Sequence, residues 1–378
     1  MLRILSIFGT RPEAIKMAPV IRELERHGDR IQSIVCSTGQ HRHMLDQVYK
    51  LFDIVPDIIL NLMQPNQTLA DLTARLFDAL NPVVEEVKPD WVLAQGDTTT
   101  VLVASLVAYY HRVPFGHVEA GLRTGDINSP FPEEANRRMA DTVAELMFAP
   151  TELGKQALLR EGHPETRIVV TGNTVIDALH IVAALPYEWG TGPLANVPTN
   201  KRLVLITAHR RESFGEPFRR LCMALRDVGQ HFASNGVHLV YPVHLNPNVR
   251  QPVQEILGSA ENITLLEPLD YLSLVQLMKR SSLVLTDSGG IQEEAPSLGV
   301  PVLVMRDTTE RPEAVNAGVA KLVGTSRAQI VKEVVTLLTN TASYDAMAKS
   351  VNLYGDGKAA KRIIAALLKH RNQGTVRS

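Results

Sequence analysis

The feature that most constrains this chain is a regular alternation of short apolar runs with longer amphipathic segments along its 378 residues. The apolar runs, such as Leu2–Phe8, Trp91–Gln95 and Arg202–Thr207, are typical of buried parallel strands. The segments between them have the periodicity of helices with one buried face. Strands that alternate with helices in this way predict an α/β protein with doubly wound, Rossmann-like parallel sheets.

One break in the alternation indicates two domains. Residues 185–201 contain three prolines and two glycines without any clear period, which is typical of a connection between domains. A helix expected at 173–185 moves the boundary earlier, so we predict an N-terminal Rossmann-like domain at 1–172. A C-terminal Rossmann-like domain is expected at 173–356, with a helix at 357–378 packing back on the first domain. The strand ends of two such domains would face each other across a cleft.

Composition excludes several classes of function. The formal net charge is −1 and no basic run is present, so neither a nucleic acid nor an anionic membrane is an expected partner. No apolar stretch approaches the length of a membrane span. The first residues have the pattern of a strand and a charged loop, not of a signal peptide. Cys36 and Cys222 are expected as buried thiols, and the predicted location is the cytoplasm.

The stretch at 286–314 carries the clearest ligand-binding pattern. Ser288, Gly289 and Gly290 follow an apolar run and precede a helix expected near Ile291, where turning backbone and free N–H groups suit a phosphate. Glu294 lies one turn into that helix and can accept hydrogen bonds from sugar or ribose hydroxyls, and Arg311 follows the next strand. A tight turn before a solvated acidic helix is the plain alternative. Because ligands gather at strand carboxyl ends, we favour a nucleotide-sugar site.

The first half of the chain offers charged residues at other strand ends. Arg11 and Lys16 begin a helix, where the dipole disfavours cations, so a bound anion explains them better than a plain surface position. Asp97, Glu119 and Glu133 follow strands or begin helices. Each alone is more typical of structure, and Asp97 is a natural helix N-cap. Together they predict a carboxylate cluster that can divide acid and base duties.

The second half places His209, Arg210 and His244 after two of its strands, which favours phosphate recognition over isolated structural histidines.

Motifs for cofactors and metals, in contrast, are absent or misplaced. The only GxGxxA match lies at 190–195, contains a proline and falls in the connection. The sequence has no P-loop, HExxH, CxxC or GxSxG motif. We therefore predict no cofactor and no metal.

Long motifs in a fixed order extend this interpretation. The chain contains FGTRPEAIKMAP, TGQHRHMLDQV, GDTTT, GHVEAGLRTGD, PEEANRR, TGNTVIDA, HRRESFG, YPVHLNPNVR, TDSGGIQEEAPSLG and MRDTTERPEA. With these motifs it resembles the bacterial non-hydrolysing UDP-N-acetylglucosamine 2-epimerases from about residue 4 to beyond residue 354. The resemblance implies a glycosyltransferase-B type fold, a homodimer and reversible conversion of UDP-GlcNAc to UDP-ManNAc, a donor for surface polysaccharides. It implies elimination of UDP to a 2-acetamidoglucal, followed by re-addition.

The resemblance also implies a role for individual residues. Those expected around the UDP-sugar are Arg11, Lys16, His209, Ser288, Gly289, Gly290, Glu294 and Arg311. The segment 267–274, with Leu269 and Leu274 at its contacts, would hold uracil through backbone groups. Asp97, Glu119 and Glu133 form the acid/base set, and the first two also contact the sugar. His209 would stabilise the leaving diphosphate.

Other functions remain open at this point. A glycosyltransferase of the same fold would use the same UDP site but pass the sugar to an acceptor, and it would not need three carboxylates around C1 and C2. A non-catalytic nucleotide-sugar sensor would lack one or more of Asp97, Glu119 and Glu133, all of which are present. A hydrolysing relative would release UDP and free ManNAc, which only the products reveal.

A second UDP-GlcNAc site is expected beside the first, with Gln40, His41, Gln47, Arg210 and His244 as its candidates. The intact TGQHRHMLDQV and VHLNP motifs motivate this hypothesis. The double change Gln40→Ala and His244→Ala should abolish sigmoidal kinetics and spare UDP binding. Initial rates over a range of UDP-GlcNAc concentrations check it, and unchanged cooperativity would reject the second site.

Overall fold

The computed structural model describes residues 1–39, 42–64, 67–349 and 351–374. The chain divides into two compact units, Met1–His180 with Tyr354–Ser378 (unit 1) and Ile181–Leu353 (unit 2). Each unit is built on one parallel sheet with helices between its strands, so the predicted α/β class is confirmed. Unit 1 as observed extends to His180, whereas the sequence places the boundary at residue 172, before the helix at Thr174–Ala183.

Unit 1 contains a seven-stranded sheet with the order β3-β2-β1-β4-β5-β6-β7. Its strands are β1 (Leu2–Phe8), β2 (Ile31–Ser37), β3 (Ile58–Ile59), β4 (Trp91–Gln95), β5 (Phe115–Val118), β6 (Leu146–Ala149) and β7 (Ile168–Val170). Its helices are α1 (Arg11–Arg26), α2 (Arg42–Phe52), α3 (Leu69–Val87), α4 (Thr99–Tyr110), α5 (Glu133–Val143), α6 (Glu152–Arg160), the start of α7 (Thr174–Ala183), and α15 (Ala359–Gly374). The order reverses between β1 and β4, which is where such sheets bind ligands.

Unit 2 contains a six-stranded sheet with the order β10-β9-β8-β11-β12-β13. Its strands are β8 (Arg202–Thr207), β9 (Val237–Pro242), β10 (Ile263–Leu266), β11 (Ser281–Thr286), β12 (Val302–Val304) and β13 (Ala320–Leu322). Its helices are α8 (Glu216–His231), α9 (Pro247–Leu257), α10 (Tyr271–Arg280), α11 (Gly289–Ser297), α12 (Pro312–Asn316), α13 (Arg327–Thr339) and α14 (Thr341–Met347). The order reverses between β8 and β11, as it does in unit 1 between β1 and β4.

Each unit has its own apolar core, formed where helices pack their apolar faces on a sheet of apolar strands. Cys36 lies in the core of unit 1 and Cys222 in that of unit 2, both as buried free thiols, as predicted. The sequence analysis missed β3, because two residues at a sheet edge give no periodic signal. Within the described residues, no helix combines the length and apolar character needed to cross a bilayer.

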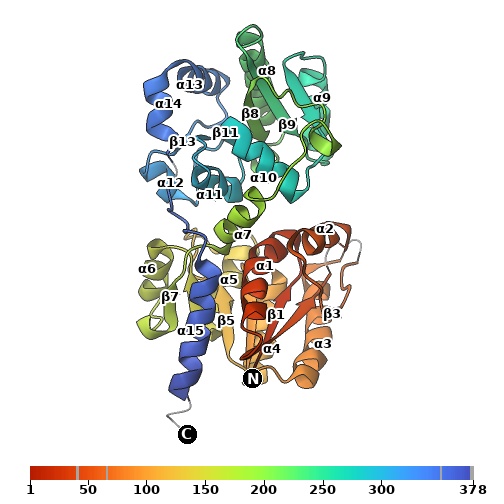
Figure 1. The fold of residues 1–378 in the computed structure, drawn as a ribbon, viewed down its shortest axis with the longest axis vertical. Helices are drawn as coiled ribbons and strands as arrows, with labels where there is room; N and C mark the ends of the chain where they lie inside the picture. Colours follow the sequence, from red (N-terminus) through yellow and green to blue (C-terminus); the bar gives the residue numbers. More distant parts are fainter. Residues whose placement is uncertain (40–41, 65–66, 350, 375–378) are drawn as a thin grey trace. The chain divides into compact units, whose positions relative to one another are not determined.

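The C-terminal helix α15 belongs to unit 1, where it packs against α1 (Figure 1). Asp177 on α7 fixes its start, since the two carboxylate oxygens accept hydrogen bonds from the backbone N–H groups of Ala359 (3.1 Å) and Ala360 (3.0 Å). Burial raises the pKa of Asp177, and the two backbone hydrogen bonds act in the opposite direction. One side chain therefore caps a helix that starts 182 positions later.

Replacement of this cap gives a direct test of the packing. Asp177→Ala should lower the free energy of unfolding by about 1–2 kcal/mol, because two buried N–H groups lose their acceptors. Chemical denaturation followed by circular dichroism measures the change. Asp78→Ala, on the exposed face of α3, is the matched control and should stay within about 0.5 kcal/mol of the parent. Equal effects of the two changes would contradict the capping role.

Candidate functional site

In unit 1, the predicted residues lie at the carboxyl ends of three neighbouring strands, β1, β4 and β5. The Lys16 Nζ atom on α1 lies 2.6 Å from Glu119 Oε2, directly after β5. Gln95, the last residue of β4, donates its side-chain N–H to the same oxygen at 3.0 Å. Only 17% of the Lys16 side chain and 7% of the Glu119 side chain are exposed. The structure therefore brings two predicted residues into one partly buried ion pair.

The backbone at Glu119 is unusual. Its φ is +70°, in the left-handed region that residues other than glycine rarely adopt. Its N–H donates to the Phe148 carbonyl at 3.0 Å, so the neighbouring strand holds it in place. Backbone strain of this kind concentrates at functional sites. It supports the choice of Glu119 among the many carboxylates of the chain.

Asp97 does not cap helix α4, so that plain alternative is wrong. Thr98 is the N-cap, and its side-chain oxygen accepts from the Val101 N–H at 3.4 Å. The Asp97 carboxylate instead pairs with the Arg137 guanidinium, and its carbonyl accepts from the Asn136 side chain at 2.9 Å. Both partners lie on α5. Side chains from α5 therefore hold Asp97, which lies just before α4.

Glu133 is the first residue of α5, the helix that carries these partners, and its side chain is half-buried. Glu134, the next residue, is fully buried and pairs with Arg137 at 3.2 Å and Arg138 at 3.0 Å. Neither glutamate supplies an N-cap, because Pro132 occupies that position. Both glutamates lie in the first turn of α5, where the helix dipole favours acidic side chains. Glu134 organises α5, and Glu133 lies at its start.

A buried pair that the sequence analysis missed lies beneath these carboxylates. His117 in β5 places its Nδ1 atom 2.5 Å from Asp141 Oδ1 and its Nε2 atom 2.7 Å from the Gly96 carbonyl oxygen. Both side chains are fully buried. Because carboxylate and carbonyl oxygens only accept, each ring nitrogen carries a proton and the ring is an imidazolium. The signal in the sequence was a histidine inside an otherwise apolar strand.

The charges on His117 and Asp141 stabilise each other. Burial lowers the pKa of His117, but the charge and hydrogen bonds of Asp141 outweigh it and leave this pKa raised. Burial raises the pKa of Asp141, but His117 and Arg123 outweigh it and leave this pKa lowered. The Arg123 guanidinium lies 2.7 Å from Asp141 Oδ2. Asp141 is therefore ionised between two cations.

Glu13 is a second buried residue that the sequence analysis passed over. Its Oε2 atom accepts from the N–H groups of Gly9 at 3.0 Å and Thr10 at 2.6 Å, and its Oε1 atom accepts from the Thr98 hydroxyl at 2.5 Å. Burial raises the pKa of Glu13, and these hydrogen bonds act against it. The turn before α1 and the turn before α4 are thus tied together. The capping box TRPE at the start of α1 was its signal.

In unit 2, α11 begins at Gly289, two residues earlier than expected. Gly289 and Gly290 have no positive φ, so they are not needed for a sharp turn. Limited space for a side chain explains the glycine at position 289 better, because a Cβ atom there would lie 3.3 Å from Glu310 Oε1. Ser288 is the N-cap but makes no side-chain capping bond. The first N–H groups of α11 therefore lack a side-chain cap, as a phosphate site requires.

The neighbours of this helix start hold its side chains. Glu294 is buried, and its Oε1 atom accepts from the Tyr271 hydroxyl at 2.6 Å. Arg311 directs its Nε atom to Glu293 on α11, forming a mostly buried ion pair. Leu269 is buried just before α10, whereas the Leu274 N–H donates to the Asp270 carbonyl at 3.0 Å within that helix. The backbone N–H of Leu274 is therefore already engaged within α10.

His209 lies at the end of β8 and contacts two groups from other strands. Its ring stacks on that of His244, with centroids 5.1 Å apart and planes at 11°. Asp287 Oδ2 accepts from the backbone N–H groups of His209 (2.7 Å) and Arg210 (2.8 Å). Burial lowers the pKa of His209, and His244 and Arg210 lower it further while Asp287 opposes them. Burial and the neighbouring cationic groups therefore disfavour the charged form of the His209 ring.

The residues predicted for a second site divide into two groups. Gln40 and His41 lie outside the described residues. Gln47 is exposed on α2 in unit 1. Arg210 and His244 adjoin His209 in unit 2, and the Arg210 Nη2 atom lies 3.5 Å from Glu310 Oε1. In unit 2, residues assigned to two different sites are thus direct neighbours.

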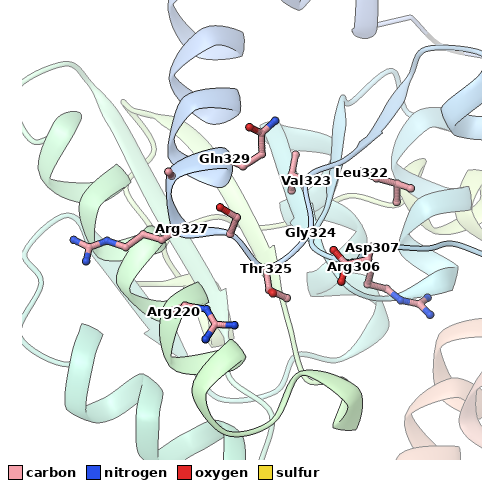
Figure 2. Close-up of a pocket in the computed structure, with 11 residues that line it drawn as sticks. Arg220, Arg306, Asp307, Leu322, Val323, Gly324, Thr325, Arg327 and Gln329 are labelled. Atoms are coloured by element: carbon pink, nitrogen blue, oxygen red, sulfur yellow. The ribbon is translucent and has the colours of Figure 1, made fainter.

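A pocket of about 690 Å³ in unit 2 is lined by other residues (Figure 2). It is lined by residues after β12, residues after β13 and the start of α13, with Arg220 and Arg327 among its charged groups. None of the predicted site residues lines it, so the nucleotide-binding prediction does not depend on it. Across the described ranges, no group of three or more His, Cys, Asp or Glu side chains is arranged to hold a metal ion.

Comparisons with known proteins agree with the motifs. The family model for UDP-N-acetylglucosamine 2-epimerase matches residues 22–368. The curated UDP-N-acetylglucosamine 2-epimerase of Escherichia coli (strain K12) is 54% identical over 376 residues, which cover 98% of this chain and 99% of that protein. The enzyme of the same name from Yersinia pestis is 53% identical over 384 residues, covering 98% and 99%.

Solved structures extend the similarity to the fold. The crystal structure of UDP-GlcNAc 2-epimerase from Neisseria meningitidis bound to UDP-GlcNAc has a TM-score of 0.89 to this chain at 48% identity. The match covers 97% of this chain and all of that one, 100%. The predicted glycosyltransferase-B type architecture of two parallel-sheet units is thereby confirmed.

Removal of one partner of the buried pair should destabilise the fold measurably. Asp141→Asn should lower the free energy of unfolding by about 3–5 kcal/mol, because it leaves the buried imidazolium without its counterion and removes one of the two carboxylates that Arg123 contacts. Thermal and chemical unfolding at several pH values measure it. Asp227→Asn, which removes a surface partner of Arg327, is the control and should cost less than about 1 kcal/mol.

The pH dependence of the free energy of unfolding gives a second test with the Asp141→Asn variant. The pKa of His117 is raised above its ordinary value of 6.5, so its stabilisation is complete below that value and lost as pH rises through the folded-state pKa. The pKa of Asp141 is lowered from 3.8, so its stabilisation exists above that value and is lost as pH falls. Asp141→Asn should remove both slopes. If Asp141→Asn still lost stability as the pH rises above 6.5, the pairing of His117 with Asp141 would be contradicted.

Proposed function

Because the chain belongs to the UDP-N-acetylglucosamine 2-epimerase family, we propose that it interconverts UDP-GlcNAc and UDP-ManNAc by inverting C2 of the sugar. The observation that supports this most directly is the group of strand-end residues in unit 1, where Glu119 pairs with Lys16 and Asp97 pairs with Arg137. UDP-ManNAc would supply donors for surface polysaccharides. Homodimeric assembly and a cytoplasmic location stay predictions.

The reaction must solve a chemical problem at C2. This carbon has no adjacent carbonyl, so its proton is not acidic enough for direct removal. Elimination avoids this, since the C1–O bond to UDP breaks as a base takes the C2 proton and the C2–H electrons form a C1–C2 double bond. UDP then adds back to C1 while an acid protonates C2 on the opposite face. The net change is inversion at C2, without any redox step.

Unit 2 holds the UDP in this proposal. The start of α11 at Ser288, Gly289 and Gly290 offers N–H groups to the diphosphate. Glu294 lies one turn further and accepts from the ribose hydroxyls, beside Tyr271. His209 donates a hydrogen bond to the diphosphate as negative charge develops on the leaving group. Retention of UDP after C1–O cleavage makes re-addition faster than loss.

Arg311 and the segment around Leu269 complete the nucleotide contacts, the first toward the diphosphate and the second toward the base. Arg11 and Lys16 from unit 1 contribute further positive charge. Asp97, Glu119 and Glu133 carry the proton transfers, since inversion needs one group for each face of C2. The Asp97 carboxylate is paired with the Arg137 guanidinium and the Glu119 carboxylate with the Lys16 ammonium group.

The transferase and sensor alternatives have less support. A sensor would not need three carboxylates, and two of them are paired here with cations. Sugar transfer requires an acceptor, and no sequence motif indicates one. Formation of UDP-ManNAc from UDP-GlcNAc alone, followed by anion-exchange separation of the nucleotide sugars, tests the proposal. Free UDP with ManNAc would instead identify a hydrolysing enzyme, and no turnover with UDP bound would favour the sensor.

Isosteric removal of each carboxylate tests the assigned roles. Asp97→Asn, Glu119→Gln and Glu133→Gln should each lower kcat by about 10²–10⁴-fold, because each removes a proton-transfer group and keeps its shape. The Kd for UDP should stay within about threefold of the parent, as calorimetry would show. Glu85→Gln, exposed on α3, is the matched control. Full activity in all three variants would reject the acid/base set.

A further inference from the structure

We propose that His117 is a positioning residue for the epimerisation, which fixes the Asp97 carboxylate through the Gly96 peptide. The inference rests on the proposed function and assigns a role to a residue that never touches the substrate in this account. It starts from the contact between the His117 Nε2 atom and the Gly96 carbonyl oxygen, 2.7 Å long and fully buried.

Gly96 is held through both of its backbone polar groups. Its N–H donates to the Val118 carbonyl at 3.0 Å, and its carbonyl accepts from His117. The backbone at Gly96 has a φ of +90°, which a larger residue would rarely adopt. The Gly96 carbonyl and the Asp97 nitrogen belong to one planar peptide group. A fixed Gly96 carbonyl oxygen therefore fixes the Asp97 nitrogen and Cα atoms, from which the side chain extends.

The same histidine also lies next to the second carboxylate. His117 stands two residues before Glu119, in the strand that pairs with β4 on one side and β6 on the other. Its register partners are Ala94 and Met147, both apolar. The His117 ring thus links the turn that carries Asp97 with β5, the strand that Glu119 directly follows.

The protonation state makes this link rigid. With acceptors at both ring nitrogens, His117 cannot turn over without losing a buried hydrogen bond. Asp141 holds the other side of the ring, and Arg123 (2.7 Å) and the Gly121 N–H (3.3 Å) hold Asp141. Arg123 in turn pairs with Glu161 at 2.6 Å. The chain of contacts runs from Glu161, the residue after α6, through Arg123, Asp141 on α5 and His117 in β5 to the Asp97 peptide.

A purely structural role is the competing explanation. Buried ion pairs contribute little net stability, and apolar side chains of similar volume often do as well. A cationic histidine in an apolar strand is therefore poorly explained by stability alone. Its contact with the peptide before Asp97 gives it a function in placing that carboxylate.

Two substitutions separate the two contacts of the ring. In His117→Gln, the side-chain amide is long enough to donate to the Gly96 carbonyl, but the positive charge is lost. In His117→Asn, the shorter amide can reach Asp141 only. We expect His117→Asn to lower kcat about 30- to 100-fold with KM within about threefold, because the catalytic group is displaced and binding is kept. His117→Gln should recover at least about fivefold of that loss.

The decisive readout is a double-mutant cycle. If His117 acts through Asp97, adding His117→Asn to Asp97→Asn should lower the residual kcat by less than about threefold. A structural defect would lower both backgrounds equally. His238→Asn in β9 is the matched control, since His238 is also buried and bonded, with Nε2 2.7 Å from Thr264 Oγ1. Its kcat should stay within about twofold of the parent.

The outcomes are distinct. Unchanged kcat in both His117 variants, or losses that multiply with Asp97→Asn, would overturn the positioning role and leave the proposed function intact. If His117→Asn fails to fold, His117→Gln in both backgrounds decides by the same comparison, with folded protein verified by its unfolding midpoint. A wild-type chain that does not form UDP-ManNAc would overturn both the function and this inference.

Discussion

Every strand of each sheet pairs in parallel with its neighbours, and this constraint determines where chemistry can occur. Parallel strands place all their strand-to-helix turns at one edge. In unit 1, the turns after β1, β4 and β5 are neighbours although they are distant in sequence, so Lys16 meets Glu119 across 103 positions. Glu13 and Thr98 meet in the same way across 85. The candidate site exists because the topology assembles it.

Much of this arrangement could be predicted because its signals are local. Apolar runs between helical segments gave β1, β4 and β8 with the observed bounds. Strand ends followed by charged residues indicated Asp97 and Glu119, which the structure holds with cations. Motif order also implied the family, since long motifs at fixed order carry more information than any single glycine pattern.

The rest could not be predicted because it depends on long-range contacts. Nothing next to His117 in the sequence shows that it meets Asp141, 24 positions away, or the Gly96 carbonyl. Whether Asp97 caps α4 was equally ambiguous, since Thr98 beside it is as good a cap. The glycines at the start of α11 have ordinary helical backbone, and Glu310 explains Gly289 through space. Each of these outcomes depends on which side chains lie close together in the fold, and residue type alone does not show this.

The central claim is that C2 is inverted by proton transfer to and from carboxylates. Proton NMR of the purified protein with UDP-GlcNAc in heavy water, without added metal or nicotinamide, tests it most directly. Elimination and re-addition predict UDP-ManNAc with deuterium at C2, and deuterium appearing at C2 of the remaining UDP-GlcNAc as the reaction reverses. Formation of UDP-ManNAc that keeps its original C2 proton would contradict a mechanism in which solvent-exchanging carboxylates remove and return that proton.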